Sequence, residues 1–214
     1  MKASISTISI VLIFVSLSIS LTTSNDSVDF DSFLRCLPVH ANLLVPIADA
    51  ILTPTNSSFE YIYQLRASNL RTLLSSTSRL VAIITALHPS HAQATVVCAK
   101  RHGFQVRIRS GGHDFEGLSY TSNVPFVILD MFNLHSIDVD IESETAWVQA
   151  GTTTDELYYR IAEKSKVHGF PSGFGTTIGI GGHFSGGGYG FLMRKYGLSI
   201  DRDGHGSGFW LTRI

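Results

Sequence analysis

Between residues 80 and 110 the pattern of apolar and polar positions predicts a strand, a helix and a second strand. Leu80–Thr85 is a short apolar run with β-branched residues, as in a buried strand, and Gln105–Arg109 alternates between polar and apolar residues. Between them, Ser90–Gln93 matches a capping box at the start of a helix, and Gly103 is placed to end that helix. This order of elements predicts a βαβ unit.

The next part of the chain contains a second helix start and further segments in which polar and apolar residues alternate. A second capping box, Thr153–Glu156, predicts another helix. The pattern as a whole indicates one continuous α+β domain from about residue 78. Strands are expected at Pro125–Leu129, Ser136–Ile141 and Thr145–Gln149, the last two close enough to form a hairpin.

Charge and composition narrow the class of protein. Sixteen Lys and Arg residues stand against 17 Asp and Glu residues, giving a net charge of −1, so the chain has no electrostatic footprint for nucleic acid or for an anionic membrane. A hydrophobic content of 44% is ordinary for a globular protein. Two cysteines are too few for a disulfide-rich miniprotein or for a zinc module with four cysteine ligands.

The first 24 residues have the layout of a secretory signal peptide. Lys2 precedes an uncharged apolar run, Ile8–Leu21, and small polar residues follow it. The run is shorter than the roughly 20 apolar residues that a membrane-spanning helix needs, so a signal peptide is favoured over a membrane anchor. Behind it, residues 25–77 are expected to form an N-terminal, mostly helical segment with a turn near Pro54.

Secretion would change the chemistry of several residues. In an oxidising compartment Cys36 and Cys98 are candidates for a disulfide, and the alternative is two buried thiols. Asn25 and Asn56 each begin an Asn-X-Ser sequon and are the expected glycosylation sites.

The first segment with candidate chemistry is the loop Arg109–Asp114, which follows directly after a strand. Its two consecutive glycines would let backbone N–H groups turn inward together, and such a nest binds an anion such as a pyrophosphate. The hydroxyl of Ser110 would add a donor, and His113 would sit at the mouth of the loop. The alternative is an ordinary tight turn between strands.

The second segment is Gly179–Gly190, where seven of twelve residues are glycine. Either the backbone runs against a flat ligand, or the segment is a flexible linker. The interleaved Ile180, Phe184 and Tyr189 argue against a linker, which would be polar.

Other nucleotide and metal signatures do not fit these segments. The position that would complete a G-x-G-x-x-G dinucleotide fingerprint after Gly181 is Phe184, and the chain has no G-x-x-x-x-G-K-[ST] sequence. His113 and His183 could be imagined as a metal pair, but no ligand spacing supports them, and no metal is expected.

At these residues a family resemblance is clear. Arg-Ser-Gly-Gly-His-Asp-Phe-Glu-Gly-Leu-Ser-Tyr (109–120) and Gly-Gly-His-Phe-Ser-Gly-Gly-Gly-Tyr-Gly (181–190) resemble the plant berberine bridge enzyme-like family of secreted FAD-linked oxidoreductases. The similarity runs from around Cys36 to about Leu198. It implies an α+β, two-subdomain FAD-binding domain of the vanillyl-alcohol oxidase (PCMH) type over residues 78–200, followed by a divergent tail over residues 201–214.

The resemblance also implies roles for individual residues. Residues 110–114 would cradle the FAD pyrophosphate, and His113 would be bonded covalently to the flavin. His183 would donate a hydrogen bond near flavin N1, and Tyr189 would be a catalytic base or, alternatively, a core-packing residue. Cys36 and Cys98 match the family's disulfide. The cofactor-binding set implied by the family is Arg109, Ser110, Gly111, Gly112, His113, Asp114, Ser119, Gly175, Thr177, Gly179, Gly181, Gly182 and His183.

The chain also departs from the family. Gly175 stands where many relatives carry a cysteine that forms a second flavin bond, so attachment through His113 alone is implied. Phe115 replaces a frequent tyrosine. Ile178 matches a position that gates oxygen access, and a bulky residue there favours a dehydrogenase over a fast oxidase. Family members are much longer than this chain and continue into a substrate domain.

Two functions are therefore expected as alternatives. The first is hydride transfer from a small-molecule alcohol, phenolic or carbohydrate substrate to covalently bound FAD, by a monomer secreted to the apoplast or cell wall, or sent to the vacuole. The second is a truncated secreted fragment without catalytic activity, the product of a damaged gene or an incomplete transcript.

Overall fold

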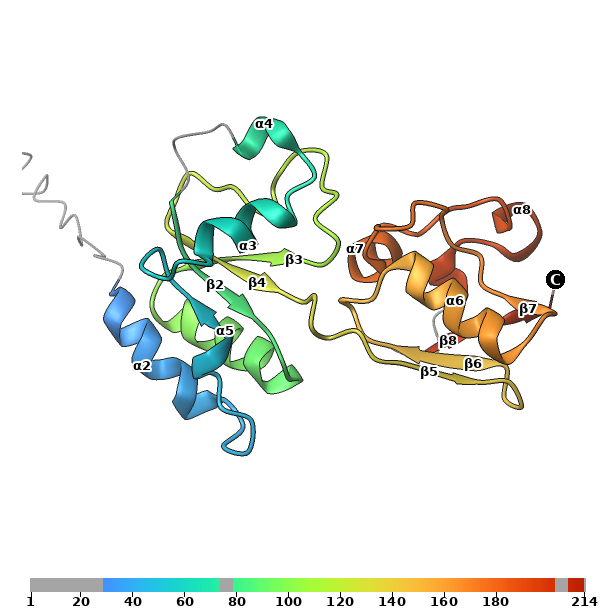
Figure 1. The fold of residues 1–214 in the computed structure, drawn as a ribbon, viewed down its shortest axis with the longest axis horizontal. Helices are drawn as coiled ribbons and strands as arrows, with labels where there is room; N and C mark the ends of the chain where they lie inside the picture. The colour runs from blue at the N-terminus through green and yellow to red at the C-terminus, as the bar shows by residue number, and fades with distance from the viewer. Residues whose placement is uncertain (1–28, 74–78, 203–207, 214) are drawn as a thin grey trace, which may run out of the picture.

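A computed structural model describes residues 29–73, 79–202 and 208–213 (Figure 1). The expected signal peptide (1–24) and the sequon at Asn25 lie outside the described residues. Within those ranges, no helix has the length and apolar character needed to cross a membrane. The chain forms two subdomains that lie side by side in Figure 1, joined by the segment that follows β4 (Phe126–Asp130).

The first subdomain is built on a four-stranded sheet with the order β1-β2-β4-β3. The central strand β4 pairs in parallel with β2 and with β3, and β1 pairs antiparallel with β2. The expected strand–helix–strand unit is present as β2, α5 and β3, but β4 lies between its two strands. These elements span the residue ranges β1 (Ile51–Leu52), β2 (Leu80–Thr85), α5 (Pro89–Arg101) and β3 (Gln105–Arg109).

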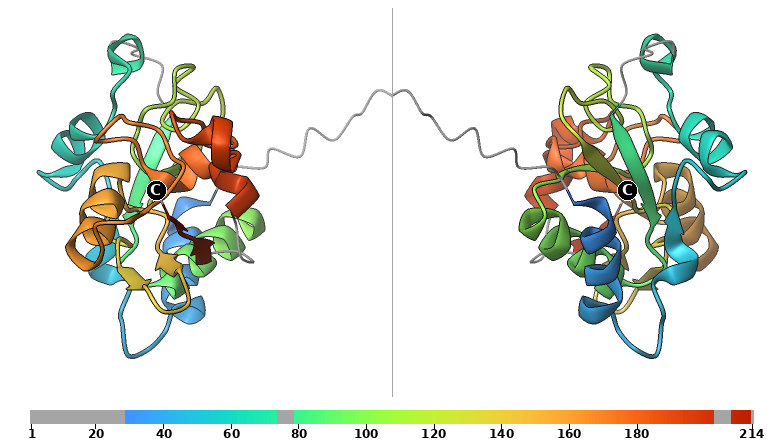
Figure 2. Two further views of the ribbon diagram at one scale, coloured as in Figure 1. Left: turned by 90° about the vertical axis from the view of Figure 1, so that its right-hand side faces the viewer. Right: turned by 90° about the vertical axis from the view of Figure 1, so that its left-hand side faces the viewer.

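Helices cover both faces of this sheet. The helix α2 (Phe30–His40) packs beside α5 on one face, and α3 (Phe59–Leu65) lies on the opposite face with α4 (Leu70–Leu73) beyond it (Figures 1 and 2). Along β2, Ala82 and Ile84 point into the α2–α5 core, while Ile83 points into the core beneath α3. The helices within residues 29–73 therefore cover this sheet, and β1 is its edge strand, while η1 (Ala48–Ala50) and the turns around it interrupt the helices.

The start of α5 differs from the expected capping box at Ser90. The helix begins at Pro89, and the N-cap is His88, whose Nδ1 accepts a hydrogen bond of 3.1 Å from the backbone N–H of Ser90. Proline favours the first helical position because its ring fixes φ and it has no N–H to satisfy, which moves the cap one residue earlier. Gly103, with φ of +74°, follows the helix end as expected.

The second subdomain has an antiparallel sheet of the order β5-β6-β8, with the expected hairpin as β5 and β6. The expected capping box of Thr153 and Glu156 is present at the start of α6, which packs Leu157 and Ile161 against the sheet. The bounds are β5 (Ile137–Asp140), β6 (Thr145–Val148), α6 (Thr154–Lys164), β7 (His168–Gly169), α7 (Ile180–Ser185), α8 (Met193–Tyr196), η2 (Ser199–Arg202), β8 (Gly208–Trp210) and β9 (Thr212–Arg213).

Residues 208–213, within the tail expected to diverge from the family, are part of this subdomain. Residues 208–210 pair with β6 as β8, and β9 pairs antiparallel with β7. Arg213 forms an ion pair of 2.7 Å with Glu144, in the turn between β5 and β6. The described part of the tail is thus held by strand pairing and by charge.

A disulfide joins the two helices on one face of the first sheet. It links Cys36 of α2 to Cys98 of α5, as expected from the sequence, and the two cysteines are 62 residues apart. The cross-link therefore closes a long loop and fixes α2 on α5.

Removing this cross-link should lower the free energy of unfolding. The Cys98→Ser variant is expected to lose about 4 kcal/mol, because a closed loop of this length restricts the unfolded chain. Urea denaturation of oxidised wild type and variant would measure the difference. Reduced wild type is the matched control, since it should unfold at a urea concentration close to that of the variant.

Candidate functional site

The two subdomains meet where the loop after β3 touches the segment before α7. A Cβ atom built on Gly111 would lie 2.2 Å from the backbone nitrogen of Gly179. Conversely, a Cβ on Gly179 would lie 2.1 Å from the Oγ of Ser110 and 2.2 Å from the nitrogen of Gly111. Because no side chain fits at either position, both residues must be glycine for the backbones to approach this closely.

The next residue turns the loop sharply. Gly112 has φ of +70°, and a Cβ there would lie 1.8 Å from the carbonyl oxygen of Arg66. Within the described ranges, the N–H groups of Gly111, Gly112 and His113 donate to no acceptor. Consecutive free N–H groups in such a turn form an anion-binding nest, so this backbone fits a pyrophosphate. An ordinary tight turn whose N–H groups face solvent stays the alternative.

His113 lies at the surface end of this loop and reaches across the junction. Its Nε2 is 2.8 Å from the Oγ1 of Thr177, while its Nδ1 forms no hydrogen bond to any described residue. An open cleft of about 430 Å³ lies beside the imidazole. Its lining includes Ser68, Asn69, Leu70, Arg71, His113, Asp114 and Phe115.

Three other side chains of the expected cofactor-binding set form hydrogen bonds to protein groups. The hydroxyl of Ser110 donates to the carbonyl oxygen of Ala150 at 2.6 Å, which ties the loop to the second subdomain. The carboxylate of Asp114 accepts hydrogen bonds from the backbone N–H of Ser119 at 2.8 Å and from its hydroxyl at 3.2 Å. These side chains shape the loop, and the backbone is the part that presents donors.

Arg109 also has a structural contact in place of the expected cofactor contact. Its guanidinium is fully buried and bonds to Asp130 at 2.7 and 3.1 Å and to the carbonyl oxygens of Ile62 and Tyr63. Arg66 approaches the other oxygen of Asp130 at 3.0 Å. Asp130 is not among the residues expected from the sequence, although its position at the end of an apolar strand was a usable signal.

The glycine-dense segment is ordered, which excludes the flexible linker. Its first half forms α7, and a Cβ on Gly181 would lie 2.8 Å from the carbonyl oxygen of Ala150. Further on, a Cβ on Gly190 would lie 1.9 Å from the carbonyl oxygen of Ser172. A Cβ on Gly182, in contrast, would meet no atom within 4 Å. Several of these glycines therefore allow close backbone packing, and Gly182 leaves its outer side open.

His183 on α7 is held as a neutral imidazole. Its Nε2 accepts a hydrogen bond of 2.9 Å from the backbone N–H of Gly173, so the proton of the neutral ring is on Nδ1. Burial lowers the pKa of His183 below its ordinary value, because desolvation disfavours the charged form. The remaining Nδ1–H of this ring donates to no acceptor among the described residues.

Tyr189 is exposed, so the core-packing alternative for this residue is wrong. Its side chain is 70% exposed, and its backbone lies against Gly173. Next to it the exposed rings of Phe174 and Phe191 stack with their centroids 5.0 Å apart. Phe115, on the other side of the junction, is also fully at the surface. Largely exposed aromatic side chains therefore lie on both sides of the junction.

Gly175, which stands in place of a family cysteine, lies against Ile178, which matches the position that gates oxygen access. A Cβ on Gly175 would lie 2.4 Å from the Cδ1 of Ile178, so the side chain of Ile178 occupies the place of a residue-175 side chain. The carbonyl oxygen of Gly175 accepts from the Oγ1 of Thr154 at 2.6 Å. Both cysteines are in the disulfide, so no thiol is present among the described residues for a second attachment.

Comparison with known proteins agrees with this geometry. A family profile described as the FAD binding domain matches residues 81–202, and the chain belongs to that family. Its relatives place it more narrowly among the berberine bridge enzyme-like proteins. Berberine bridge enzyme-like 10 of Arabidopsis thaliana is 51% identical over 193 residues, which cover 90% of this chain and 37% of the relative.

Two further relatives carry activity in their names. Tetrahydroberberine oxidase of Berberis wilsoniae is 51% identical over 90% of this chain and 36% of its own length. A solved structure of a Phl p 4 variant, a glucose dehydrogenase, superimposes with a TM-score of 0.74 at 38% identity, covering 80% of this chain and 34% of that one. The chain thus spans a little over a third of the length of the relatives it matches.

The buried ion pair of Arg109 yields a prediction for stability. Asp130→Asn leaves the guanidinium of Arg109 buried without its charge partner and should lower the free energy of unfolding by about 3–5 kcal/mol. Urea denaturation measures this loss. The matched control is Glu163→Gln, which breaks the exposed pair with Arg160 and should cost less than about 1 kcal/mol. Equal losses in both variants would contradict the structural role of Asp130.

The junction between the subdomains gives a second prediction. Gly111→Ala should cost at least about 1–3 kcal/mol, because its methyl group would overlap the backbone of Gly179. Gly182→Ala is the control, since its methyl group points into open space within a helix and should be neutral or stabilise by up to about 1 kcal/mol. Thermal or urea unfolding distinguishes them, and an unperturbed Gly111→Ala variant would exclude the close contact.

The state of His183 gives a prediction about pH. Its folded pKa lies below the ordinary value of 6.5, so below about that pH the unfolded chain binds more protons than the folded chain. This residue therefore makes stability rise with pH up to about 6.5 and contributes a loss as the pH falls below it. An NMR titration, with His183→Gln to assign the signal, should show a midpoint below 6.5; a midpoint above it contradicts the partly buried, neutral ring.

Proposed function

We propose that this chain binds FAD covalently through His113 and that the protein oxidises a small alcohol, phenolic or carbohydrate substrate by hydride transfer. The observation that carries the proposal is the nest of three free N–H groups at residues 111–113. It stands beside an exposed imidazole and an open cleft in a chain of the FAD binding domain family. Bound FAD would supply the acceptor for the hydride that leaves a substrate carbon.

The contacts of His113 favour attachment through one particular atom. Thr177 occupies Nε2, so Nδ1 is the nitrogen that is free to form a bond. A neutral ring that donates from Nε2 to the Oγ1 of Thr177 carries its lone pair on Nδ1, where a nucleophile is needed. Gly175 offers no second tether, so the attachment is single.

His183 and Tyr189 would serve the reaction from the other subdomain. The Nδ1–H of His183 is a preorganised donor, and such a donor stabilises negative charge that develops nearby. The exposed Tyr189 would take the proton of the substrate hydroxyl as the hydride leaves. Ile178, filling the space beside Gly175, would limit access of oxygen and favour a dehydrogenase.

The class of substrate is supported by the relatives' names and by the surface. One relative is named for the oxidation of tetrahydroberberine, and another is called a glucose dehydrogenase. The exposed rings of Phe115, Phe174 and Phe191 would suit contact with the flat face of a ring. We also propose that the protein acts as a monomer.

The proposal includes entry into the secretory route, with the apoplast, cell wall or vacuole as destination. The sequence motivates it through the N-terminal apolar run, and the disulfide is consistent with an oxidising compartment. Asn56 is exposed in a turn, where its Oδ1 accepts from the backbone N–H of Thr53 at 2.7 Å. Its accessibility suits glycosylation, and mass spectrometry of the secreted protein tests it.

A second candidate function is a secreted product without catalytic activity. The chain spans 37% of the length of berberine bridge enzyme-like 10, so retention of flavin by these 214 residues is the property to be measured. The two candidates differ in whether this chain alone retains flavin.

The covalent attachment can be tested with two proteins. One is the 214-residue chain, and the other is a chimera that adds the remaining C-terminal part of berberine bridge enzyme-like 10. After denaturation, flavin fluorescence should stay on the peptide that contains His113. His113→Ala should release all flavin on denaturation, and Thr177→Val should slow covalent attachment by removing the partner of Nε2. His135→Ala, an exposed histidine away from the loop, is the matched control.

Each outcome separates the candidates. A folded chimera without flavin, or with flavin that washes out on denaturation, would show that single attachment at His113 is wrong. Flavin in the chimera alone would support the site and assign the short chain to the inactive product. Flavin in both proteins would support the oxidoreductase.

A further inference from the structure

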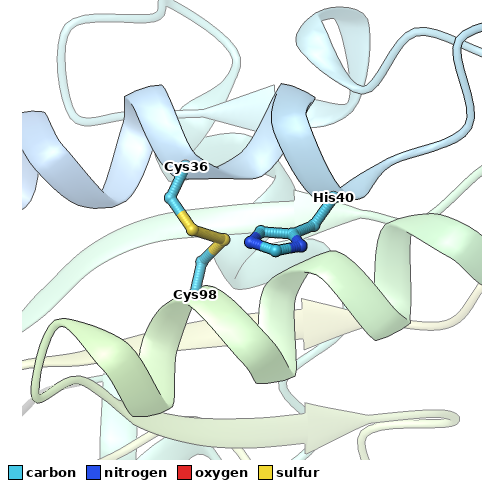
Figure 3. A group of neighbouring side chains, drawn as sticks. All are labelled: Cys36, His40 and Cys98. Carbon is cyan, nitrogen blue, oxygen red and sulfur yellow. A yellow bond between two sulfur atoms is a disulfide. The ribbon is translucent and has the colours of Figure 1, made fainter.

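A group of three potential metal ligands lies between α2 and α5, separate from the candidate flavin site. Cys36 and His40 are one helical turn apart on α2 and share a face, and Cys98 meets them from α5. One ligand atom from each side chain lies within 4.8 Å of the other two. Figure 3 shows the imidazole of His40 beside the two sulfur atoms.

The disulfide does not use His40. The Nε2 of His40 is buried and has no hydrogen-bond partner among the residues that the structure describes. A buried nitrogen without a partner costs the free energy of its lost hydration, so its position beside two sulfur atoms calls for a role. Packing on α5 alone would be served as well by an apolar side chain.

We propose that reduction of the disulfide converts this group into a binding site for one Zn²⁺ ion, with Cys36, His40 and Cys98 as ligands and water in the fourth position. Thiolate sulfur and imidazole nitrogen are the ligands that zinc prefers. Tetrahedral zinc, with bonds of about 2.0–2.3 Å, holds its ligand atoms about 3.3–3.8 Å apart. In the oxidised chain the two sulfur atoms are bonded at 2.05 Å, and the three ligand atoms all lie within 4.8 Å of one another. After reduction, rotation of the cysteine side chains would separate the sulfur atoms to the zinc spacing.

Charge balance also favours zinc at this place. Two thiolates neutralise the charge of Zn²⁺, and a neutral cluster can remain buried, whereas two unpaired thiolates could not. Cys98 is fully buried and Cys36 is 7% exposed, among apolar neighbours that include Phe33, Leu37 and Ala94. In the oxidised chain both sulfur atoms are bonded to each other, so no thiolate is available.

The conversion is a balanced two-electron reduction followed by metal binding. A phosphine reductant breaks the S–S bond and takes an oxygen atom from water to become a phosphine oxide. The two hydrogen atoms of that water are transferred to the sulfur atoms, so both cysteines become thiols. Zinc binding then releases two thiol protons and uses the lone pair of neutral His40. The same three residues would thus hold α2 on α5 by a disulfide under oxidising conditions and by a metal under reducing conditions.

Cobalt provides a direct test, because Co²⁺ bound to thiolate in tetrahedral geometry absorbs visibly. The full chain is unfolded in urea with a phosphine reductant, refolded without oxygen, and titrated with Co²⁺. We expect a thiolate-to-cobalt band that saturates at one metal per chain, disappears when Zn²⁺ is added, and releases two protons. The oxidised chain should give no band.

Variants distinguish a three-ligand site that includes His40 from weak metal binding by the two cysteines alone. His40→Ala should weaken Co²⁺ binding at least about tenfold, since even partners outside the metal shell change affinity 10–100-fold. His40→Cys should retain tight binding as a third thiolate, and His135→Ala should bind as wild type. The proposal is overturned if the reduced chain gives no band, if His40→Ala binds as tightly as wild type, or if binding persists in urea.

Discussion

The backbone of Gly111 lies against the backbone of Gly179, and the arrangement of the two subdomains depends on this contact. A side chain at either position would overlap the other chain segment at little more than 2 Å. The contact brings Ser110 within reach of Ala150, and it places the imidazole of His113 opposite Thr177. Every feature of the candidate flavin site that combines both subdomains therefore follows from two residues without side chains.

The loop that makes this contact begins directly after a buried ion pair. Arg109 and Asp130 are register partners at the ends of the neighbouring parallel strands β3 and β4. Their charges and the two carbonyl oxygens on α3 satisfy each other away from water. The nest of N–H groups at residues 111–113 is thus mounted on a rigid base, which keeps its donors oriented without help from a ligand.

Local features of this chain could be predicted from the sequence, and pairings between distant segments could not. The strands β2, β3 and β6 and the capping box at Thr153 follow from short-range patterns, and the glycines around His113 marked the loop. Pro89 displaced the cap expected at Ser90. The place of β4 between β2 and β3, the bond from His113 to Thr177, and the burial of Arg109 against Asp130 join residues 21 or more apart, so no local pattern encodes them.

The place of β4 in the sheet has a consequence for folding during synthesis. When β2, α5 and β3 have left the ribosome, β3 still lacks its hydrogen-bonded neighbour, because that strand is completed only at Asp130. Until then the edge of β2 that pairs with β4 has unpaired N–H and C=O groups, and closure of the sheet requires contacts between segments far apart in the chain. Such non-local pairing is slow, so the nascent chain passes through an interval in which it depends on protection from aggregation.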